Sequence, residues 1–363
     1  MKNEKLLKSV EKAVFILRDL YTKYGYLPFK MSKVEEYDLY AENKQFLIGD
    51  SVITFNDTDG RLLALKPDVT LSIIKNTASD RGSKRKVYYN ENVYRVSQKT
   101  HRFKEIMQSG IECIGDIDTL DIYESVELSC KSLMLLGEDF ILDISHLGIL
   151  SAVISAACDS DNFRRDVTRL ISEKNKHEIE VLSKEWGVGE ENTAKILSLV
   201  DMRGKPEEVL EKLKPICASV GADKQYDELS CLVDLISESD FSDRVRIDFS
   251  VVNDMNYYNG IVFKGFLNGI SEGVLSGGQY GLLMKRMGKN AGAVGFAIYL
   301  DLLEEIYVPT REYDVDLLLI YSDSTDAKTV LRKKAEAIKE GKSVFATKIA
   351  PDKFRYKEII KLD

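Results

Sequence analysis

Residues 147–243 carry helical periodicity throughout, whereas the segments on both sides of them are patterned as strands. Short polar breaks separate four amphipathic stretches, which are "LGILSAVISAACDS", "FRRDVTRLISEKNKHEIEVLSKEWGV", "EENTAKILSLV" and "YDELSCLVDLISE". Strand character returns after them with "VRIDFSVV". The pattern predicts an all-helical insertion, residues 147–243, between two parts of one core, residues 1–146 and 244–308.

The part before the insertion, residues 1–146, mixes helices with antiparallel strands. Apolar residues at helical spacing over residues 4–24 predict an N-terminal amphipathic helix. Residues 46–74 predict two strands around a "DTDG" turn, then a helix that starts near Pro67. "KVYYNENVYRVS" and "FKEIMQSGIECIGD" predict a long antiparallel hairpin with an exposed loop. A helix at residues 119–136 and the strand "FILDISH" follow.

The part after the insertion, residues 244–308, again has strand character. The stretch "NDMNYYNGIVFKG", residues 253–265, lies between apolar segments and predicts a strand that presents one phenol to a pocket. "GVLSGG" predicts a further strand, and "GAVGFAIYLDLLEEIYV" predicts a strand that continues into a helix. Residues 309–363 have the pattern of a small βαβ-type unit.

Charge and hydrophobic patterning exclude several functional classes. The chain has 363 residues, enough for two or three domains, and a formal net charge of −8. That charge is opposite to the positive field that phosphate backbones attract, so we expect no nucleic-acid partner. No apolar run reaches the ~18 to 20 residues of a membrane span, and the charged amphipathic start has no signal-peptide cleavage site. We therefore expect a cytoplasmic protein with no membrane partner.

Cysteine and histidine usage argues against a metal site or a disulfide framework. The five cysteines lie at wide spacing without a CxxC pair, and we expect them to be buried as small apolar residues. The three histidines lie far apart in the sequence. We expect no metal ion and no cofactor. The residues concerned are Cys113, Cys130, Cys158, Cys217, Cys231, His101, His146 and His177.

Four segments in register resemble histidyl-tRNA synthetase over residues 1–308. They are "LKPDVT" (65–70), "VYRVSQKTHRFKEIMQSGIECIG" (93–115), "VVNDMNYYNGIVF" (251–263) and "LSGGQYGLLMKRMG…GFAIYLDLL" (275–303). The resemblance implies an α+β fold of the class II aminoacyl-tRNA synthetase type. In that fold an antiparallel sheet is flanked by helices, and the amino acid and ATP bind on one face of the sheet.

The same resemblance implies a pocket for free histidine. An acidic residue and a threonine of the family contact the substrate's α-amino group, a glutamine and a glutamate contact the substrate and its imidazole, and tyrosines border the ring. Two of these positions are four apart on one predicted strand and therefore share a face. The predicted histidine-binding residues are Asp68, Thr70, Arg95, Gln108, Glu112, Tyr257, Tyr258 and Tyr280.

The residues themselves are compatible with that pocket. Free histidine needs a carboxylate for its ammonium group and acceptors or phenols for its ring nitrogens. Simpler interpretations stand beside this one. Asp68 can be only a helix-initiating residue, Glu112 can be a surface carboxylate, and of Tyr257 and Tyr258 one can face the core while the other packs under a loop. The apolar neighbours of Glu112 favour a buried strand, where an unpaired carboxylate is costly.

Several positions depart from the synthetase pattern. The signature arginine of "VRGLDYY" is Asn253, and the motif 3 arginine is Leu302. Losing one cation at a developing oxyanion costs ~100- to 1000-fold in rate. We therefore expect no adenylate formation and no catalytic residue. Further departures are Ser97 in "FRxE", Gln279 and Gly281 in "GGRYD", and Ser32 at the motif 1 proline.

These departures resemble the regulatory subunits of ATP phosphoribosyltransferase, catalytically inactive paralogues of histidyl-tRNA synthetase. Residues 309–363 are too few for the synthetase's anticodon-binding domain, which points to the same family. The resemblance implies a short-form catalytic subunit as partner, a homodimer within a hetero-octamer, and feedback inhibition by histidine, in the first step of histidine biosynthesis. Two alternatives remain open, a divergent histidyl-tRNA synthetase and a stand-alone histidine sensor.

Overall fold

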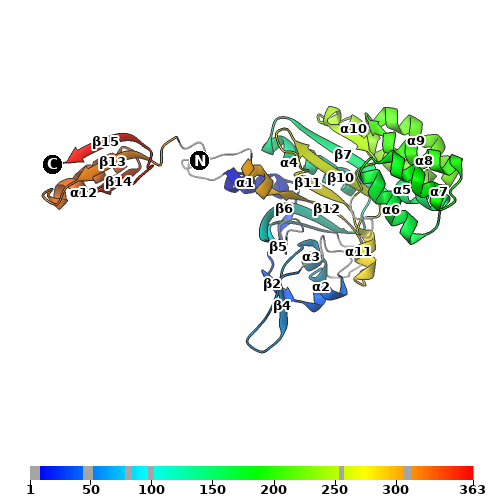
Figure 1. The fold of residues 1–363 in the computed structure, drawn as a ribbon, viewed down its shortest axis with the longest axis horizontal. Helices are drawn as coiled ribbons and strands as arrows, with labels where there is room; N and C mark the ends of the chain where they lie inside the picture. The colour runs from blue at the N-terminus through cyan, green and yellow to red at the C-terminus, as the bar shows by residue number, and fades with distance from the viewer. Residues whose placement is uncertain are drawn as a thin grey trace. The chain divides into compact units, whose positions relative to one another are not determined.

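The chain forms two compact units, residues 1–307 and 308–363, each described by itself (Figure 1). The structure is a computed structural model. The residues that it describes are 9–43, 52–77, 84–96, 102–252, 257–305 and 312–362.

A mainly antiparallel sheet of nine strands, counted over the described residues, organises the larger unit. Its order is β1-β5-β6-β12-β11-β10-β7-β9-β8. Only β1 with β5 and β7 with β9 pair in parallel. The strands are β1 (Leu27–Pro28), β5 (Arg85–Val96), β6 (Phe103–Gly115), β7 (Phe140–His146), β8 (Arg203–Gly204), β9 (Val245–Asp248), β10 (Ile261–Leu267), β11 (Leu275–Gln279) and β12 (Gly292–Tyr299).

The predicted hairpin of β5 and β6 is confirmed, with twelve residue pairs from Arg85↔Ile114 to Val96↔Phe103. The predicted N-terminal helix is α1 (Ser9–Lys23), whose Ala13 and Leu17 enter the core. The helix predicted at 119–136 is α4 (Thr119–Leu136). The side chain of Asp118 caps this helix by accepting hydrogen bonds from backbone N–H groups of its first turn.

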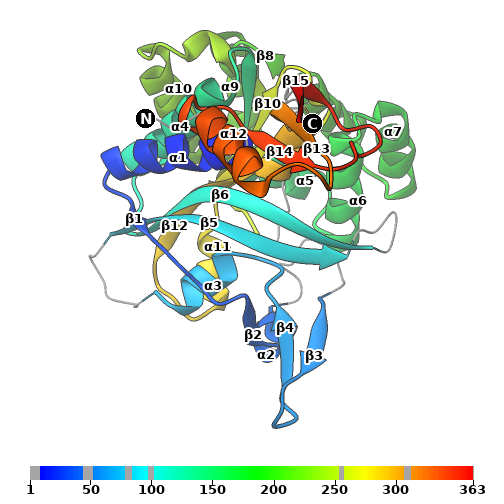
Figure 2. The ribbon, with the colours of Figure 1, turned by 90° about the vertical axis from the view of Figure 1, so that its left-hand side faces the viewer.

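Two hydrophobic clusters cover opposite faces of the sheet. Residues of α1 and α4 belong to the first cluster, and residues of α3 (Thr70–Lys75) and α11 (Gly281–Arg286) belong to the second. Because side chains alternate along a strand, Ile111 of β6 joins the first cluster and Ile114 joins the second. Figure 2 shows α1 on one side of β5 and β6, and α3 and α11 on the other.

A small antiparallel sheet lies next to α3 in the sequence. Its strand order is β2-β4-β3 within the described residues. The helix after it begins at Thr70, three residues later than the predicted start at Pro67. The Asp68 side chain accepts a hydrogen bond from Leu71 N (2.9 Å), which fixes the first turn at this point. The bounds are β2 (Val34–Glu36), α2 (Asp38–Glu42), β3 (Thr54–Asn56) and β4 (Leu62–Leu65).

Among the described residues, the insertion consists of six α-helices, one short strand and the start of a 3-10 helix (Ser242–Arg244). The expectation of an all-helical insertion is wrong at β8, whose two residues pair with β9 at the edge of the main sheet. The longest predicted helical stretch is also divided, because Lys174 between α6 and α7 has φ +56°. The helices are α5 (Leu147–Ala157), α6 (Asp161–Ser172), α7 (Lys176–Glu185), α8 (Glu190–Asp201), α9 (Pro206–Val220) and α10 (Asp223–Ser237).

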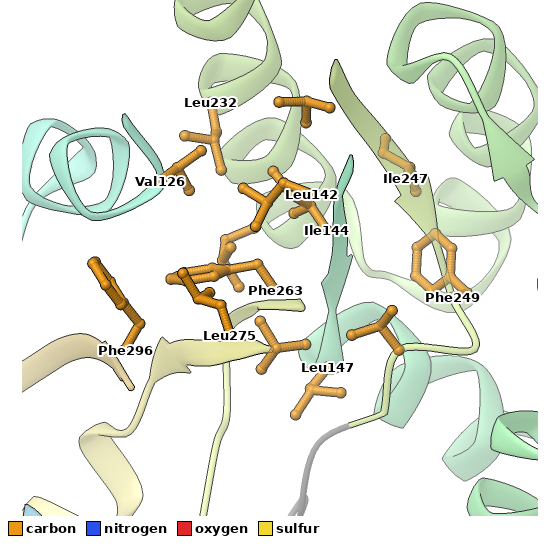
Figure 3. Close-up of a cluster of buried hydrophobic side chains, with 14 of the residues drawn as sticks. Val126, Leu142, Ile144, Leu147, Leu232, Ile247, Phe249, Phe263, Leu275 and Phe296 are labelled. Carbon is orange, nitrogen blue, oxygen red and sulfur yellow. The ribbon is translucent and has the colours of Figure 1, made fainter. Parts of the chain in front are cut away.

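The insertion shares its core with the sheet. Leu232 of α10 and Leu147 of α5 belong to the same buried cluster as Leu142 of β7 and Phe263 of β10 (Figure 3). In Figure 1 the helices of the insertion lie beside β7 and β10. Burying a leucine of this size stabilises a fold by about 1.5–3 kcal/mol. The insertion is therefore part of the larger compact unit.

The strand predicted over residues 253–265 begins only at Ile261. Residues 257–260 form a turn, and residues 253–256 lie outside the described part of the chain. Two hydrogen bonds that Gln279 accepts account for the late start. Its carbonyl oxygen accepts from Asn259 N (3.1 Å), and its side-chain Oε1 accepts from Ile261 N (2.5 Å). The tyrosines at 257 and 258 are thus carried by a turn.

The smaller unit has the predicted βαβ pattern. The central strand β13 pairs in parallel with both neighbours, in the order β14-β13-β15 over the described residues. Asp326 caps its helix by accepting from Thr329 N (3.2 Å). The elements are β13 (Val315–Tyr321), α12 (Ala327–Lys339), β14 (Val344–Thr347) and β15 (Tyr356–Leu362).

Two further observations concern burial and membranes. Cys113, Cys130 and Cys217 are buried as predicted, but Cys158 is partly exposed and Cys231 is exposed, so the expectation for these last two is wrong. Among the described residues, no helix combines the length and apolar character that crossing a bilayer requires.

Candidate functional site

Glu112 stands at the centre of the polar groups on the α3 side of the sheet. Its side chain, on β6, is 3% exposed. Oε1 accepts a hydrogen bond from Thr70 Oγ1 (2.8 Å), and Oε2 accepts one from the Tyr280 hydroxyl (2.5 Å). The buried-strand interpretation of Glu112 is therefore confirmed, and the surface-carboxylate interpretation is wrong. Two hydroxyl groups of the chain itself are the partners of this carboxylate.

Burial raises the pKa of Glu112 from 4.5 to about 8. The hydrogen bonds from Tyr280 and Thr70 act in the opposite direction, because they favour the ionised form, whereas the nearby charge of Asp68 raises the pKa further. A carboxyl group with this pKa changes its charge near neutral pH. It is therefore able to hold a proton, or to give it to a basic ring placed beside it.

Glycine makes room for these side chains at two positions that the sequence analysis did not single out. Gly295 of β12 lies directly opposite Glu112, and a Cβ atom at this position would overlap Oε2 of the carboxylate. Gly110 of β6 lies opposite Tyr89 of β5, and a Cβ atom there would lie 2.6 Å from the phenol oxygen. Both glycines are required by the close approach of a neighbouring side chain and of a backbone carbonyl oxygen, which belongs to Ile111 at Gly295 and to Phe296 at Gly110.

Tyrosine rings surround the carboxylate. The centroids of Tyr257 and Tyr258 are 4.6 Å apart, and those of Tyr257 and Tyr280 are 5.7 Å apart. Tyr257 and Tyr280 are buried, whereas Tyr258 is partly buried. Burial raises the pKa of Tyr257 and of Tyr280 well above the usual value, so both phenols stay neutral hydrogen-bond donors. Tyr89, which the sequence analysis missed, is buried on the same face.

Asp68 and Arg95 lie next to this cluster. Arg95 Nε donates to the carbonyl oxygen of Pro67 (2.9 Å), which holds the guanidinium beside the start of α3. Burial raises the pKa of Asp68, and the hydrogen bond from Leu71 N and the charge of Arg95 oppose that shift. The hydrogen bond from Leu71 N agrees with a helix-initiating role for Asp68, and its ligand-binding role stays a prediction. The same position also sets a carboxylate and a cation side by side near Glu112.

Gln108 occupies the same sheet face as Glu112, as their spacing predicted. It is 4% exposed and lies between Glu91 of β5 and Tyr299 of β12 in the register of the sheet. Glu91 in turn accepts a hydrogen bond from Lys66 Nζ (2.8 Å). The lysine side chain is fully buried, and burial lowers its pKa while Glu91 opposes that shift. The sequence analysis missed this ion pair.

The departures from the synthetase pattern have structural roles where they are described. Leu302 packs against the first hydrophobic cluster. Gln279 donates from Nε2 to Oε1 of Glu228 on α10 (3.0 Å), so this side chain joins the insertion to the sheet. Ser32 Oγ accepts from the backbone N–H of Val34 (3.1 Å). Asn253 and Ser97 lie outside the described residues.

The arrangement suits recognition of a small polar aromatic molecule. It offers a buried carboxyl group of raised pKa, neutral phenols around it, and an acidic and a basic side chain at one side. In the part of the chain that the structure describes, no group of three histidine, cysteine, aspartate or glutamate residues is placed to hold a metal ion. The chemistry on view is hydrogen bonding and charge pairing.

Comparison with known sequences gives one family and many relatives. The family described as histidyl-tRNA synthetase matches residues 3–303. The ATP phosphoribosyltransferase regulatory subunit of Clostridium acetobutylicum is 27% identical over 337 residues, which are 90% of this chain and 83% of that protein. The protein of the same name from Caldanaerobacter subterraneus subsp. tengcongensis is 30% identical over 286 residues, 77% of this chain and 74% of that one.

Comparison with solved structures gives the same fold. The crystal structure of an ATP phosphoribosyltransferase regulatory subunit/histidyl-tRNA synthetase from Bacillus halodurans C superposes with a TM-score of 0.79 at 22% identity, covering 97% of this chain and 93% of that chain. A chain of the ATP phosphoribosyl transferase (HisG:HisZ) complex from Thermotoga maritima gives 0.63 at 23% identity, covering 80% and 97%. These likenesses establish the fold as histidyl-tRNA synthetase-like.

Proposed function

The chain belongs to the histidyl-tRNA synthetase family and, within it, to the regulatory subunits of ATP phosphoribosyltransferase, and from this premise we propose that it senses free histidine on behalf of a separate catalytic subunit. In this proposal the chain is required for the activity of a short-form catalytic subunit. It also mediates inhibition of that subunit by histidine, the end product of histidine biosynthesis.

The observation that carries the proposal is the buried carboxyl group of Glu112. An imidazole ring has two nitrogens, and its protonated form donates from both. A carboxyl group whose pKa is about 8 pairs with such a ring by giving it a proton, so that a charge-assisted hydrogen bond forms in a buried place. Tyr257 and Tyr258 offer aromatic faces to the ring.

The backbone groups of a free amino acid also find partners here. Asp68 offers a carboxylate for the α-ammonium group, and Arg95 beside it offers N–H donors for the α-carboxylate. Thr70 lies between the groups proposed for the ligand's backbone and the group proposed for its imidazole. It is the first residue of α3, which follows Asp68, and its hydroxyl donates to Glu112. Gln108 on the same face adds a neutral amide. The eight predicted residues thus supply every kind of group that histidine needs.

Three observations support the proposed assembly. The relatives above carry the name of a regulatory subunit, and the Thermotoga maritima structure is of a complex. The net charge of −8 does not suit a nucleic-acid partner. We therefore propose a hetero-oligomer with the catalytic subunit. The family resemblance implies its form, in which this chain is a homodimer within a hetero-octamer.

Reconstitution tests the proposal. The full chain is mixed with a short-form ATP phosphoribosyltransferase catalytic subunit, and activity is measured with and without histidine. We expect activation on mixing and inhibition by histidine. Glu112→Gln is expected to keep the activation and to lose inhibition by at least tenfold in histidine concentration, because one charged hydrogen bond is worth ~1.5–3 kcal/mol. Glu105→Gln, an exposed glutamate on the same strand, is the matched control.

Three outcomes would contradict the proposal. Unchanged inhibition in Glu112→Gln would place histidine elsewhere on the complex. Exchange of pyrophosphate into ATP that depends on histidine, catalysed by the isolated chain, would show adenylate formation and favour a divergent synthetase. Absence of activation on mixing would leave a stand-alone sensor.

A further inference from the structure

A cavity lies on the same sheet face as Glu112, over β7, β9 and β10, where the sheet meets the base of the insertion. Its volume is about 440 Å³, within the ~300–1,000 Å³ of small-molecule sites. Asp143 of β7, Asp248 of β9 and Lys264 of β10 line it from the sheet. Lys174 and Arg203 line it from the insertion. In the register of the sheet, these strands lie beyond β11 and β12 from the Glu112 site.

Asp143 is a buried carboxylate, and one of its two oxygens lacks a hydrogen-bond partner among the described residues. The residue is 6% exposed, and the oxygen concerned is Oδ1. Lys264 lies directly opposite it in the antiparallel pairing of β10 with β7. Opposite charges at such a position are close enough to pair. Among the described residues they form no ion pair, and the Lys264 ammonium lies over the Phe266 ring, 5.6 Å from its centroid.

The Lys264 side chain packs against the connection between β10 and β11. Its aliphatic stem lies against Gly273, where any Cβ atom would overlap Lys264 Cε. Because Gly273 has no side chain, the stem can lie there, and the ammonium lies over the Phe266 ring. Lys264 and Asp143 both line the cavity.

The second carboxylate in the cavity, by contrast, is fully paired. Asp248 Oδ1 accepts from Ser250 N (2.8 Å) and Ser250 Oγ (2.5 Å), and Oδ2 lies 3.0 Å from Lys174 Nζ and 3.4 Å from Arg203 Nε. Lys174 reaches it from a left-handed backbone conformation, φ +56°, which is unfavourable for a residue with a side chain. The turn with this strained residue places the Lys174 side chain in the cavity wall.

The charges in the cavity do not balance. Lys174, Arg203 and Lys264 contribute three positive charges, and Asp143 and Asp248 contribute two negative ones. Burial raises the pKa of Asp143, and so does the charge of Asp248, while Arg203 opposes them. The walls therefore favour an anionic ligand that also brings a hydrogen-bond donor for Asp143. A zwitterionic amino acid offers a donor to Asp143 but has no net negative charge, so it does not balance the positive charge of the walls.

We propose that this cavity binds a phosphorylated sugar, either free or as part of a nucleotide. Lys264 and Arg203 hold the phosphate, because cations and phosphate oxygens form strong charge-assisted hydrogen bonds. Asp143 accepts hydrogen bonds from the sugar hydroxyls, as a carboxylate does in sites that bind ribose through its hydroxyls. An inorganic phosphate ion fills only a small part of the volume.

Direct binding to the full chain tests the inference independently of histidine sensing and of the catalytic partner. Ribose 5-phosphate, AMP and inorganic phosphate are titrated separately by calorimetry at one ionic strength. We expect ribose 5-phosphate, AMP or both to bind more tightly than phosphate. Lys264→Met is expected to weaken every ligand about tenfold, the effect of one charged contact. Lys212→Met, an exposed lysine on α9, is the matched control and is expected to change nothing.

Asp143→Asn tests the recognition of the sugar separately from that of the phosphate. It is expected to weaken the binding of the sugar phosphate about tenfold and to leave inorganic phosphate unchanged or more tightly bound, because a negative charge has been removed. Thermal unfolding of each variant checks that the fold is kept, and Lys264→Met carries the test where Asp143→Asn does not fold. The proposal is overturned by no binding of either sugar phosphate at 10 mM, by equal affinity for ribose 5-phosphate, AMP and phosphate, or by wild-type affinity in Lys264→Met.

Discussion

Gly295 of β12 lies directly opposite Glu112 of β6, and the space that a side chain would fill at position 295 holds the Glu112 carboxylate. The two residues are almost two hundred positions apart, so the antiparallel register of β6 with β12 is what brings them together. The site is thus built from a pair, a long side chain and the glycine that admits it.

Gly295→Ala is expected to destabilise the larger unit and to weaken histidine binding. The added methyl group forces the carboxylate away from Thr70 and Tyr280, and overpacking of a buried position costs about 1–3 kcal/mol. Chemical denaturation measures the first effect and calorimetric titration with histidine measures the second. Gly189→Ala is the control, because a Cβ there meets open space and its φ of −65° suits alanine. Equal stability of the two variants would show that Glu112 moves aside freely.

Glu112→Gln is expected to change how stability depends on pH. The folded chain raises the pKa of this carboxyl group from 4.5 to about 8, so the stabilisation from the bound proton is complete below about pH 4.5 and is lost as the pH rises through 8. The loss approaches ~1.4 kcal/mol per pH unit in that window. Glutamine carries no proton to lose. The variant's unfolding free energy, relative to the wild type, should therefore increase between pH 5 and pH 8, and parallel curves would contradict the assignment.

Tyr280→Phe is expected to destabilise the chain more at pH 9 than at pH 5. The lost hydroxyl donates a hydrogen bond to Glu112 Oε2, with 2.5 Å between the two oxygens. Removing this donor from an ionised, buried carboxylate lowers the free energy of unfolding by ~1–3 kcal/mol. Tyr94→Phe is the matched control, because Tyr94 donates to the exposed Glu105 at 3.0 Å on the same hairpin. Denaturation at the two pH values compares the variants. A loss in Tyr280→Phe that is the same at both pH values would mean that only packing is affected.

Histidine binding is expected to exchange protons with the buffer at pH 9 but hardly at pH 7. At pH 7 Glu112 holds a proton and the free ring, with a pKa of ~6.5, is mostly neutral, so the proton passes between them inside the complex. At pH 9 Glu112 is ionised, and forming the same pair takes up a proton. Titrations in two buffers of different ionisation enthalpy measure the uptake. The proton uptake measured with Glu112→Gln gives the contribution of the ligand's α-amino group, which is subtracted from the wild-type value. Equal uptake in both proteins would exclude this pairing.

Local patterns predicted the elements well where one rule decided them. The apolar periodicity of α4 and the apolar sequence of β7 predicted their bounds, because α4 buries one face and β7 is a buried strand between β10 and β9. The strand at residues 253–265 failed because a side chain from another strand, Gln279, takes the N–H of Ile261 and the preceding residues turn. A pattern read within one segment of the sequence cannot show a contact with a residue of another strand.

The candidate site was predictable only through a resemblance. The spacing of Gln108 and Glu112 placed both on one strand face, and the structure confirms this. Gly295 and Tyr89 were missed because their importance depends on which strands are neighbours, and neighbours in a sheet are chosen by long-range packing.

Lys66→Met is expected to destabilise the chain by about 2 kcal/mol, and Lys66→Met with Glu91→Leu to recover most of that loss. Lys66 is fully buried and Glu91 is 15% exposed, with 2.8 Å between Nζ and Oε2. Removing one partner of a buried pair costs ~3–5 kcal/mol, whereas replacing both by apolar residues is often neutral. The partial exposure of Glu91 reduces the first cost, because water solvates the carboxylate left behind.

Denaturation of the two single variants and the double variant gives the coupling energy of the pair. Lys23→Met is the control, because Lys23 pairs with Asp19 at 2.7 Å on an exposed face of α1, and such pairs contribute about 0–1 kcal/mol. Additive losses in the double variant would contradict the expectation and would show that the lysine acts through its packing alone. Recovery would show that the cost lies in the uncompensated carboxylate, as the burial of the pair implies.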